Sequence, residues 1–497
     1  MATVMLLLWP VVALALFAKL GREKGLIWTV VAGYLLLPEP PAGIELPGLP
    51  DYFKFSAIAF SATLGFLFFR ERPSWPDDLA PPAPTGRDVQ AVVIFLLVAI
   101  FCVGAFMTVL TNGSPLVEVA SFRPGLRIWD WVAMTTEPMF PTFGFFFAWL
   151  WLRSPRHHEE LLKVIVIMGV IYSVLALVEM RLSPQINQWV YGYFPHSFLQ
   201  HVRGGEYRPL VFLRHGLWLA FFLLTAAIAA FGLFRSKTDP QLKAVYLCAG
   251  LFILAVLFLS PNLGTAMLAV IFVPLALFCS RGLQVRVAFA IAILFMAFPA
   301  VRHTIPLEKG VEFVERISVE RAQSLAFRLN NEDELLDRGL EKPLFGWGGW
   351  SRSRIFNDQG VDVTTADGAW VIFFGLRGWV GYLSYFGLFA IPVLLLTRAM
   401  RKKDMSPSTA VMASIGAANL IYLIPNSTLS PIGWLMAGAV AGFVSWRPAQ
   451  APEHVDETPD LPQPSSPYTR FAHDRTATER LYSRPGSRPT TRRVFTD

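Results

Sequence analysis

Charged residues are scarce in this sequence. Only 16% of its 497 residues are Asp, Glu, Lys or Arg, while 54% are hydrophobic. An ordinary soluble domain carries about 25% charged residues, and apolar runs long enough to cross a bilayer recur along this chain. The composition therefore excludes a typical soluble protein and predicts an all-α polytopic membrane protein.

Several signatures of chemistry are also missing. The three cysteines, Cys102, Cys248 and Cys279, all lie in apolar runs and form no motif, so we interpret them as packing residues. Single histidines such as His303 have no partners at the spacing of metal ligands. No glycine-rich nucleotide-binding loop is present. We therefore expect no metal, no cofactor and no nucleotide-driven reaction.

Basic loops account for the net charge of +7 without a nucleic-acid partner. The first apolar run lacks a basic start and a clear cleavage site, so no cleavable signal peptide is expected. About 12 to 13 transmembrane helices are predicted, because the first two segments could instead form a hairpin or lie in the interface. The predicted spans are 2–20, 25–37, 53–70, 89–110, 131–152, 160–180, 210–234, 243–260, 263–280, 284–301, 379–397, 407–424 and 428–446.

Alternate loops carry the Lys and Arg residues. Basic loops such as "KLGREKG", "LRSPRHHEELLK" and "TRAMRKKD" alternate with short loops that have none, at 38–52, 261–262 and 425–427. Because basic loops stay in the cytoplasm, we predict that the N-terminus lies outside and the C-terminus inside.

The same pattern predicts four regions. Residues 1–301 hold the first ten helices, 302–378 form one large extracytoplasmic loop with helical segments, and 379–446 hold the last three helices. Residues 447–497, rich in Pro, Ser, Thr and Arg, cannot bury a core and are expected to form a disordered cytoplasmic tail. That tail is either solvated or binds a partner or lipid headgroups.

Two arginines and a histidine open the helix that follows residue 208. Arg208, Arg214 and His215 stand at its predicted outer end, and His201 and Arg203 lie just upstream. Helix N-termini attract anions, and guanidinium groups bind phosphate through paired hydrogen bonds. The sequence predicts an anion site here. The alternative is that the arginines extend to lipid headgroups.

Two more candidate places follow in the large loop. Arg328 lies in a charged, helical segment, and the next turn, "PLFGWGGW", carries Trp347, whose ring suits the interface or sugar stacking. By itself a Gly/Trp turn could simply bend the chain.

The residues from Trp379 to Thr397 already suffice to span a bilayer, so the preceding "DGAWVIFFGLRG" is surplus. We predict a re-entrant or interfacial turn there, broken at Gly375 and Gly378. It would place Asp367 and Arg377 at the outer face, where a carboxylate could accept a proton from an acceptor hydroxyl. Alternatively, Asp367 caps a helix and forms a structural ion pair.

Taken in order, these motifs resemble the O-antigen polymerase and O-antigen ligase superfamily over roughly residues 90–445. The resemblance is carried by "RPLVFLRHGLWLAFFL", "LFLSPNLGTAMLAVIF", "FRLNNEDELLDRGLEKPLFGWGG" and "ADGAWVIFFGLRGWVGYL". The chain departs from the family in two places. Many members have Ser-Arg where it has Ser260 to Asn262, and ligases often have His-Asn where it has Asp367 and Gly368.

The resemblance implies a metal-independent glycosyltransferase in the bacterial inner membrane, with its active site facing the periplasm. Its donor would be a glycan on undecaprenyl diphosphate, and its acceptor a glycan, a lipid or a protein. Other polysaccharide-assembly proteins are expected partners, and nucleic acid is not.

By that resemblance Arg208 or Arg214 and Arg328 would hold the diphosphate, with Arg203 beside them. Asp367 and His215 are the candidate catalytic residues, and Arg377 and Trp347 are further candidates. Preorganised cations would stabilise the charge that grows on the leaving group.

We expect a polysaccharide polymerase. An O-antigen ligase-type transferase is the first alternative. A transporter such as a flippase is the second, although we find no internal repeat of the kind transporters show.

Overall fold

The computed structural model describes residues 1–46, 50–75, 89–118, 121–203, 205–316, 319–401, 405–427 and 429–445. The chain divides into two units, Met1–Pro448 and Ala449–Asp497. The predicted tail, 447–497, lies outside the described residues. All the described helices and strands belong to the first unit.

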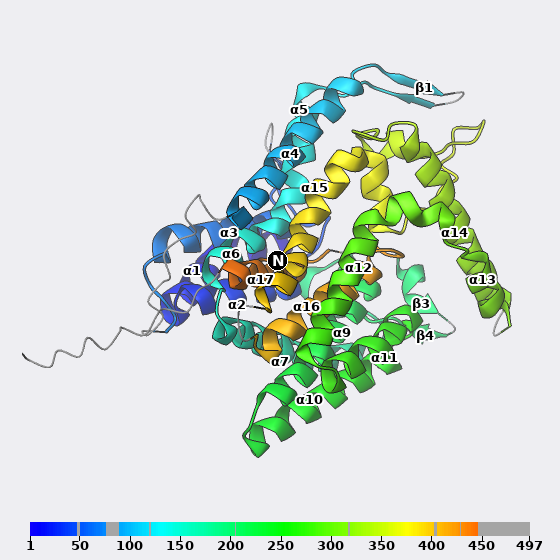
Figure 1. Ribbon diagram of the computed structural model, residues 1–497. Coiled ribbons are helices and arrows are strands. Elements are labelled where there is room, and N and C mark those ends of the chain that lie inside the picture. Colours follow the sequence, from blue (N-terminus) through cyan, green and yellow to red (C-terminus); the bar gives the residue numbers. More distant parts are fainter. Residues whose placement is uncertain are drawn as a thin grey trace, which may run out of the picture. The chain divides into compact units, whose positions relative to one another are not determined.

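Every predicted span falls on helix, and the protein is an all-α polytopic membrane protein (Figure 1). Seven described helices are long and apolar enough to cross a membrane: α1 (Ala2–Leu20), α4 (Val89–Thr111), α7 (Pro155–Leu182), α9 (Gly216–Ser236), α10 (Pro240–Leu259), α12 (Arg281–Val301) with its extension to Thr304, and α15 (Ala369–Ala399). Three shorter apolar helices are α3 (Lys54–Phe69), α11 (Leu263–Phe278) and α17 (Pro431–Ser445). The remaining predicted spans correspond to α2 (Arg22–Leu36), α16 (Pro407–Tyr422) and the pair α5 (Ile128–Met139) and α6 (Phe143–Trp151).

Short elements connect these helices. They are the hairpin β1 (Leu116–Glu118) and β2 (Ser121–Arg123), the 3₁₀ turn η1 (Phe140–Thr142), α8 (Ile186–Tyr191), η2 (Phe198–His201), the hairpin β3 (Val202–Arg203) and β4 (Glu206–Tyr207), η3 (Arg302–Thr304), α13 (Glu308–Glu315), α14 (Val319–Leu340) and η4 (Trp350–Ser353). The long segment 302–378 therefore holds α13 and α14 and also the first turns of α15.

Three predicted boundaries differ from the structure for local reasons. The span 131–152 is interrupted at η1, where Pro138 and Pro141 each remove a backbone donor. The predicted span from 210 begins later, at Gly216. The surplus segment before Trp379 is not a separate turn but the first turns of α15, whose backbone breaks at Gly378.

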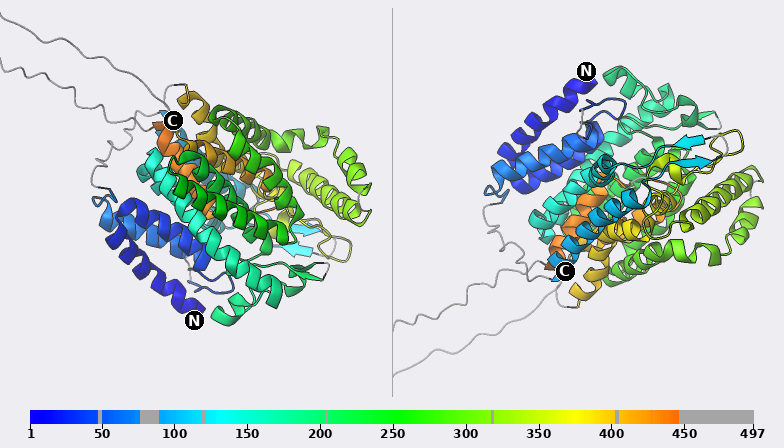
Figure 2. Two further views of the ribbon diagram at one scale, coloured as in Figure 1. Left: turned by 90° about the horizontal axis from the view of Figure 1, so that it is seen from below. Right: turned by 90° about the horizontal axis from the view of Figure 1, so that it is seen from above.

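Helix α9 forms the centre of the packing. It is buried along most of its length and packs against α7, α10, α11 and α16. Helices α1, α2 and α3 pack together beside one another at one edge (Figure 2). Helices approach closely where residues are small, as in other membrane bundles. At Gly438 of α17 an added Cβ would lie 2.1 Å from the Phe145 carbonyl oxygen of α6.

The basic segments meet at one end of the bundle. Three contacts join them: the Trp75 ring packs against His157 with centroids 5.3 Å apart, His158 Nδ1 lies 2.8 Å from Thr409 Oγ1, and Arg281 Nη1 donates to Met405 O at 2.6 Å. The loops that join the other ends of these helices therefore lie together at the opposite end of the bundle. That end of the bundle carries the candidate site. The structure agrees with the alternation of basic loops, and the side that faces the cytoplasm stays a prediction.

A reporter fusion tests that sidedness. A reporter that is active only outside the cytoplasm should be active when it is fused after Asp337, in α14, and silent after Lys243, at the basic end of α10. Protein abundance of both fusions is the control. The opposite pattern would place the candidate site on the cytoplasmic side.

Candidate functional site

The first cluster surrounds the start of α9, and Arg208 lies at its base. Arg208 is only 6% exposed, and its Nη2 donates to Pro261 O, in the turn between α10 and α11, at 3.0 Å. Its aliphatic stem lies against Gly216, where an added Cβ would meet Arg208 Cγ at 2.3 Å. This arginine is therefore held inside the protein, and it does not extend to lipid headgroups.

Glu179, near the end of α7, fixes the loop that leads into α9. Its Oε2 accepts hydrogen bonds from Leu210 N and Val211 N, both at 2.8 Å, and Oε1 accepts one from Ile186 N at 3.0 Å. Val211 has a positive φ of 56°, a conformation that is costly for a β-branched residue. The carboxylate keeps the backbone of this loop in a non-helical conformation, so α9 begins only at Gly216.

Histidines crowd around the same helix start. His201 is fully buried, its Nδ1 donates to Ser197 O at 3.0 Å, and its Nε2 accepts from Gly216 N at 3.3 Å. Burial lowers the pKa of His201 to about 4, with further lowering from His196 and Arg208. His201 is thus a neutral ring that anchors the first turn of α9.

His215, predicted to be catalytic, is the N-cap of α9. Its Nδ1 accepts from Leu217 N at 3.0 Å, so the proton of the neutral ring is on Nε2. Its ring lies 4.7 Å from the His201 ring and 5.2 Å from the His196 ring, measured between centroids. The Leu217 N–H thus occupies Nδ1 of His215, and Nε2 of the neutral ring is a donor.

Arg214 is exposed beside this cluster. The pKa of the His196 ring is lowered by burial and by the Arg214 charge, which places that charge close to the histidines. The side chain of Arg203 lies outside the described residues, although its backbone pairs with Glu206 in the β3–β4 hairpin.

The second cluster joins α14 to the start of α15. Arg328 Nε lies 3.5 Å from Asp367 Oδ2, and the two side chains are 40% and 38% exposed. The structure thus brings together two residues that the sequence placed in separate motifs. Thr365 N donates to Asn331 Oδ1 at 2.9 Å and holds the segment before Asp367 against α14. Both charged groups remain open to a ligand.

Glu332 belongs to this cluster, and the sequence reasoning missed it. It is 5% exposed, and its Oε2 lies 4.0 Å from Nε of Arg302, which is itself 3% exposed. Nη2 of Arg302 also pairs with Asp333 Oδ1 at 3.0 Å. Burial raises the pKa of Glu332 to about 7, although the Arg302 charge lowers it. A carboxyl group with a pKa near neutrality can both accept and give a proton.

A helical pattern could have revealed Glu332. Residues 328, 331–332, 335–336 and 339 recur on one face of α14, and Leu335 and Leu336 on that face are buried. A carboxylate in the inward row is the signal. It was hidden by three neighbouring acidic residues in "NNEDELLD", which suggested a uniformly solvated surface.

The end of α16 connects the two clusters. The hydroxyl of Tyr422 donates to Leu217 O, in the first turn of α9, at 2.7 Å. The next residue, Leu423, accepts a hydrogen bond at its carbonyl from Ala369 N, in the first turn of α15, at 3.0 Å. Asn426 O accepts from the same Ala369 N at 3.0 Å. Both helix starts are therefore tied to one short loop at the same end of the bundle.

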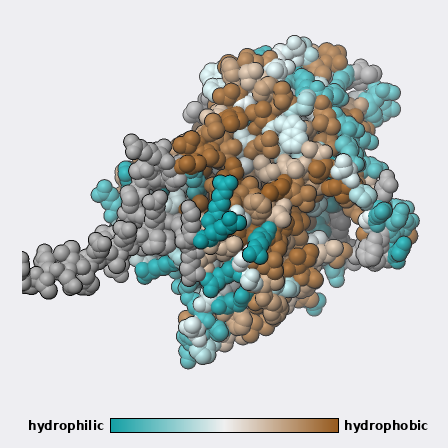
Figure 3. All heavy atoms as spheres, viewed as in Figure 1, coloured by the Kyte–Doolittle hydropathy of each residue, from teal (hydrophilic) through white to brown (hydrophobic). Residues whose placement is uncertain are grey.

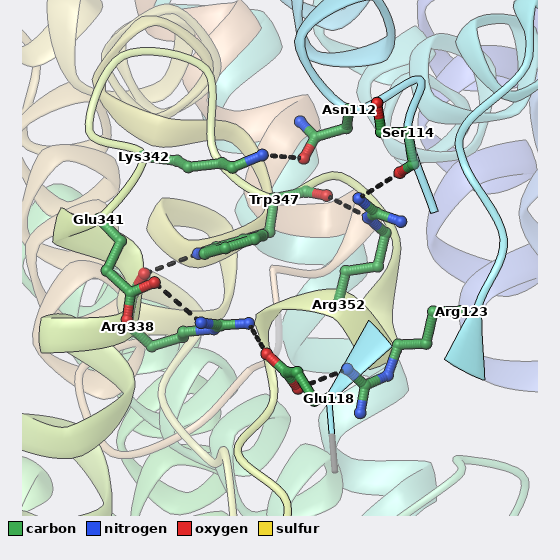
Figure 4. A network of polar contacts seen from close by, with 9 residues as sticks. All are labelled: Asn112, Ser114, Glu118, Arg123, Arg338, Glu341, Lys342, Trp347 and Arg352. Atoms are coloured by element: carbon green, nitrogen blue, oxygen red, sulfur yellow. Dashed lines mark hydrogen bonds and ion pairs between the residues drawn. The ribbon is translucent and has the colours of Figure 1, made fainter. Parts of the chain in front are cut away.

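Trp347 and Arg377 are not part of these clusters. The Trp347 ring lies between Arg338, 3.8 Å from its centroid, and Lys342, 4.4 Å from it, and is 6% exposed (Figure 4). A ring covered in this way has no free face for a sugar, so the predicted stacking role does not fit the structure. Arg377 is buried inside α15 beside the Phe101 ring, 5.5 Å from its centroid, and lies about 15 Å along the helix from Asp367.

The network around Trp347 fastens the large loop to the β1–β2 hairpin. Figure 4 shows Glu118 between Arg123 and Arg338; Arg123 Nη1 donates to Glu118 at 2.8 Å and Arg338 Nη2 at 2.5 Å. Burial would raise the pKa of Glu118, but hydrogen bonds and charge from the two arginines lower it overall. Lys342 Nζ donates to Asn112 Oδ1 at 2.6 Å at the other side of the ring. These contacts indicate a structural role for this network.

The glycine-rich turn after Lys342 docks onto the break in α15. Trp347 N donates to Gly375 O at 2.9 Å, and Trp379 N donates to Pro343 O at 2.7 Å. The break at Gly378 frees backbone groups that a continuous helix would pair internally, and the turn satisfies them. This docking fixes the first turns of α15 and so positions Asp367.

Replacing Glu332 with glutamine should remove a pH dependence of stability. The pKa of this carboxyl is about 7 in the folded protein and about 4.5 when unfolded. A raised folded pKa means that stability is lost as the pH rises through this window, on the order of 3 kcal/mol by pH 8. The Glu332→Gln variant should therefore lose less thermal stability than the wild type between pH 5 and pH 8.

Glu334→Gln is the matched control, because Glu334 is exposed two residues away. It should follow the wild-type pH profile. If Glu332→Gln did so too, Glu332 would not titrate near neutrality.

The fold and these two clusters define a polytopic α-helical membrane protein with polar side chains held at one end of its bundle. In the described ranges, no group of three or more His, Cys, Asp and Glu side chains is arranged to hold a metal ion. No protein-family model and no curated protein sequence matches the chain. The geometry of the two clusters is therefore the main support for any proposed activity.

Proposed function

We propose that the protein is a glycan polymerase that transfers sugar chains from a polyprenyl diphosphate to an acceptor glycan at the outer face of the inner membrane. The observation that supports this most directly is the open Arg328–Asp367 pair at the start of the broken helix α15, beside Arg302 and Glu332. It combines a cation for the diphosphate with carboxyl groups that can move a proton.

The pair has a simple chemical use. A diphosphate carries more negative charge than a carboxylate, so it competes with Asp367 for the Arg328 guanidinium. Donor binding would then release Asp367 at the moment when a base is needed. Arg208, held near the start of α9, would supply a second cation from the first cluster.

The transfer step balances without a co-reactant. The acceptor hydroxyl oxygen attacks the anomeric carbon of the donor, and its proton passes to Asp367. The bond between that carbon and the phosphate oxygen breaks, and its electron pair leaves with the polyprenyl diphosphate. Arg208 and Arg328 stabilise the charge that develops on the leaving oxygen.

Purified protein in lipid vesicles with a lipid-linked oligosaccharide tests the proposal. Longer glycans and free polyprenyl diphosphate should form together, and Asp367→Asn should slow their formation without weakening donor binding. Movement of the donor across the bilayer with no new glycosidic bond would instead show a transporter. Transfer to a lipid or protein acceptor only would show a ligase.

A further inference from the structure

A groove between α12 and α15 lies at the basic end of the bundle, away from both polar clusters. Its volume is about 440 Å³. Apolar side chains line most of it and cationic ones its end: Phe289, Ile293, Leu394, Leu395, Thr397, Arg398 and Arg401. The glycan site at the other end of the bundle does not account for it.

One wall of the groove is a stripe along α12. Phe289 and Ile293 lie on the same helix face as the exposed Arg286, because they follow it by three and seven residues. The stripe therefore runs from a cation near the start of α12 to apolar side chains deeper in the bundle.

The other wall, on α15, has the same polarity. Leu394, Arg398 and Arg401 follow one another at helical spacing, with the arginines at the end of the helix. The start of α12 lies beside that end, since an added Cβ at Gly282 would be 3.8 Å from the Met400 sulfur. Arg398 and Arg401 thus lie at the end of the groove that is next to the start of α12, and apolar side chains line most of the rest.

The three guanidiniums have no acidic partner in the described ranges. Arg286, Arg398 and Arg401 are all exposed, and none of them forms an ion pair with a described carboxylate. Arg235 at the same end differs, because its Nη1 donates to Ala276 O at 2.8 Å. Arg398 and Arg401, which line the groove, and Arg286, on the α12 stripe beside it, are therefore available to an anion from outside the protein.

We propose that this groove binds a phospholipid with an anionic headgroup. The phosphate would lie among Arg286, Arg398 and Arg401, and an acyl chain would follow the apolar side chains between α12 and α15. The apolar length of the groove argues for a lipid and against a free anion, which would gain nothing from it. The surrounding face is largely apolar and is interrupted by hydrophilic side chains, as expected for a surface that meets lipid (Figure 3).

Lipid competition measured by native mass spectrometry tests this proposal on the full-length protein. In mixed micelles of phosphatidylglycerol and phosphatidylcholine, the wild type should retain phosphatidylglycerol preferentially. The double variant Arg398→Gln/Arg401→Gln should lose at least about tenfold of that preference, because each basic side chain near an anionic lipid contributes roughly fivefold.

Arg70→Gln/Arg72→Gln is the matched control, since both residues are exposed beyond the end of α3 and do not line the groove. It should keep the wild-type preference. Ile293→Trp, which fills the apolar part, should weaken lipid retention without removing a charge.

Any of four results would overturn the proposal. The first is equal retention of both lipids by the wild type, and the second is an unchanged preference in Arg398→Gln/Arg401→Gln. The third is that glycerol phosphate, which lacks acyl chains, stabilises the wild type as much as phosphatidylglycerol does. The fourth is that the wild type forms a dimer which separates into monomers in Arg398→Gln/Arg401→Gln. Because none of these residues belongs to the glycan site, failure here would leave the proposed transfer reaction untouched.

Discussion

Replacing Arg328 with alanine should lower the rate of polymer formation roughly a hundredfold while the protein still folds and inserts. The guanidinium is 40% exposed, and among the described residues its ion-pair partner is the similarly exposed Asp367, so its loss should cost little stability. In the proposed reaction it meets a leaving group whose charge grows in the transition state. Loss of one such contact costs about 3 kcal/mol, which is roughly a hundredfold in rate.

Two further variants make this result specific. Arg328→Lys should recover only part of the rate, because an ammonium group cannot make the paired contacts of a guanidinium. Arg181→Ala removes an exposed arginine from the end of α7 and should leave the rate near the wild-type value. Initial rates at saturating donor, with protein amounts matched, measure all three. A wild-type rate in Arg328→Ala would remove the main support for glycan transfer.

Arg208 poses a different question, because it is buried. Its guanidinium donates to Pro261 O, and its stem fills the space beside Gly216. Truncation of this side chain would leave a cavity and an unpaired carbonyl as well as remove a charge. A loss of activity there carries information about catalysis only if thermal stability is measured in the same variant.

The membrane spans were predictable because bilayer thickness fixes the length of an apolar helix. Even the short segments that form α2 and α16 were found, since they stand between turn residues and polar loops. Predicted helix boundaries were wrong where the local structure depends on a side chain that is distant in the sequence. Glu179 holds the loop before Gly216, and nothing near residue 210 in the sequence announces this.

The candidate site was only partly predictable for a related reason. Arg328 and Asp367 each belong to a recognisable motif, yet their pairing depends on how α14 packs against α15. Glu332 differs from its acidic neighbours only in the direction it faces. The stacking role predicted for Trp347 does not fit the structure. An aromatic residue in a glycine-rich turn suggests a ring that is free to stack on a sugar, whereas two cations cover this ring.

Replacing Gly378 with alanine should destabilise the protein and displace the site. Gly378 has φ 59° and ψ −165°, a region that side-chain-bearing residues avoid. An added Cβ would also lie 2.5 Å from the Leu344 carbonyl carbon. Backbone strain of about 1–3 kcal/mol and overpacking of about 1–3 kcal/mol both oppose the substitution. The thermal midpoint should fall by several degrees, and transfer activity should fall with it.

The activity loss follows from what the break holds in place. The turn from Pro343 to Gly348 pairs with the backbone on either side of Gly378, and Asp367 stands at the start of the same helix. If the turn separates from α15, the first turns of that helix lose their support and Asp367 loses its position beside Arg328. Gly264→Ala is the matched control, because an added Cβ there meets nothing within 4 Å and the site is helical. If the two variants were equally stable, α15 could form a continuous helix through residue 378, and the break would not be needed to position the site.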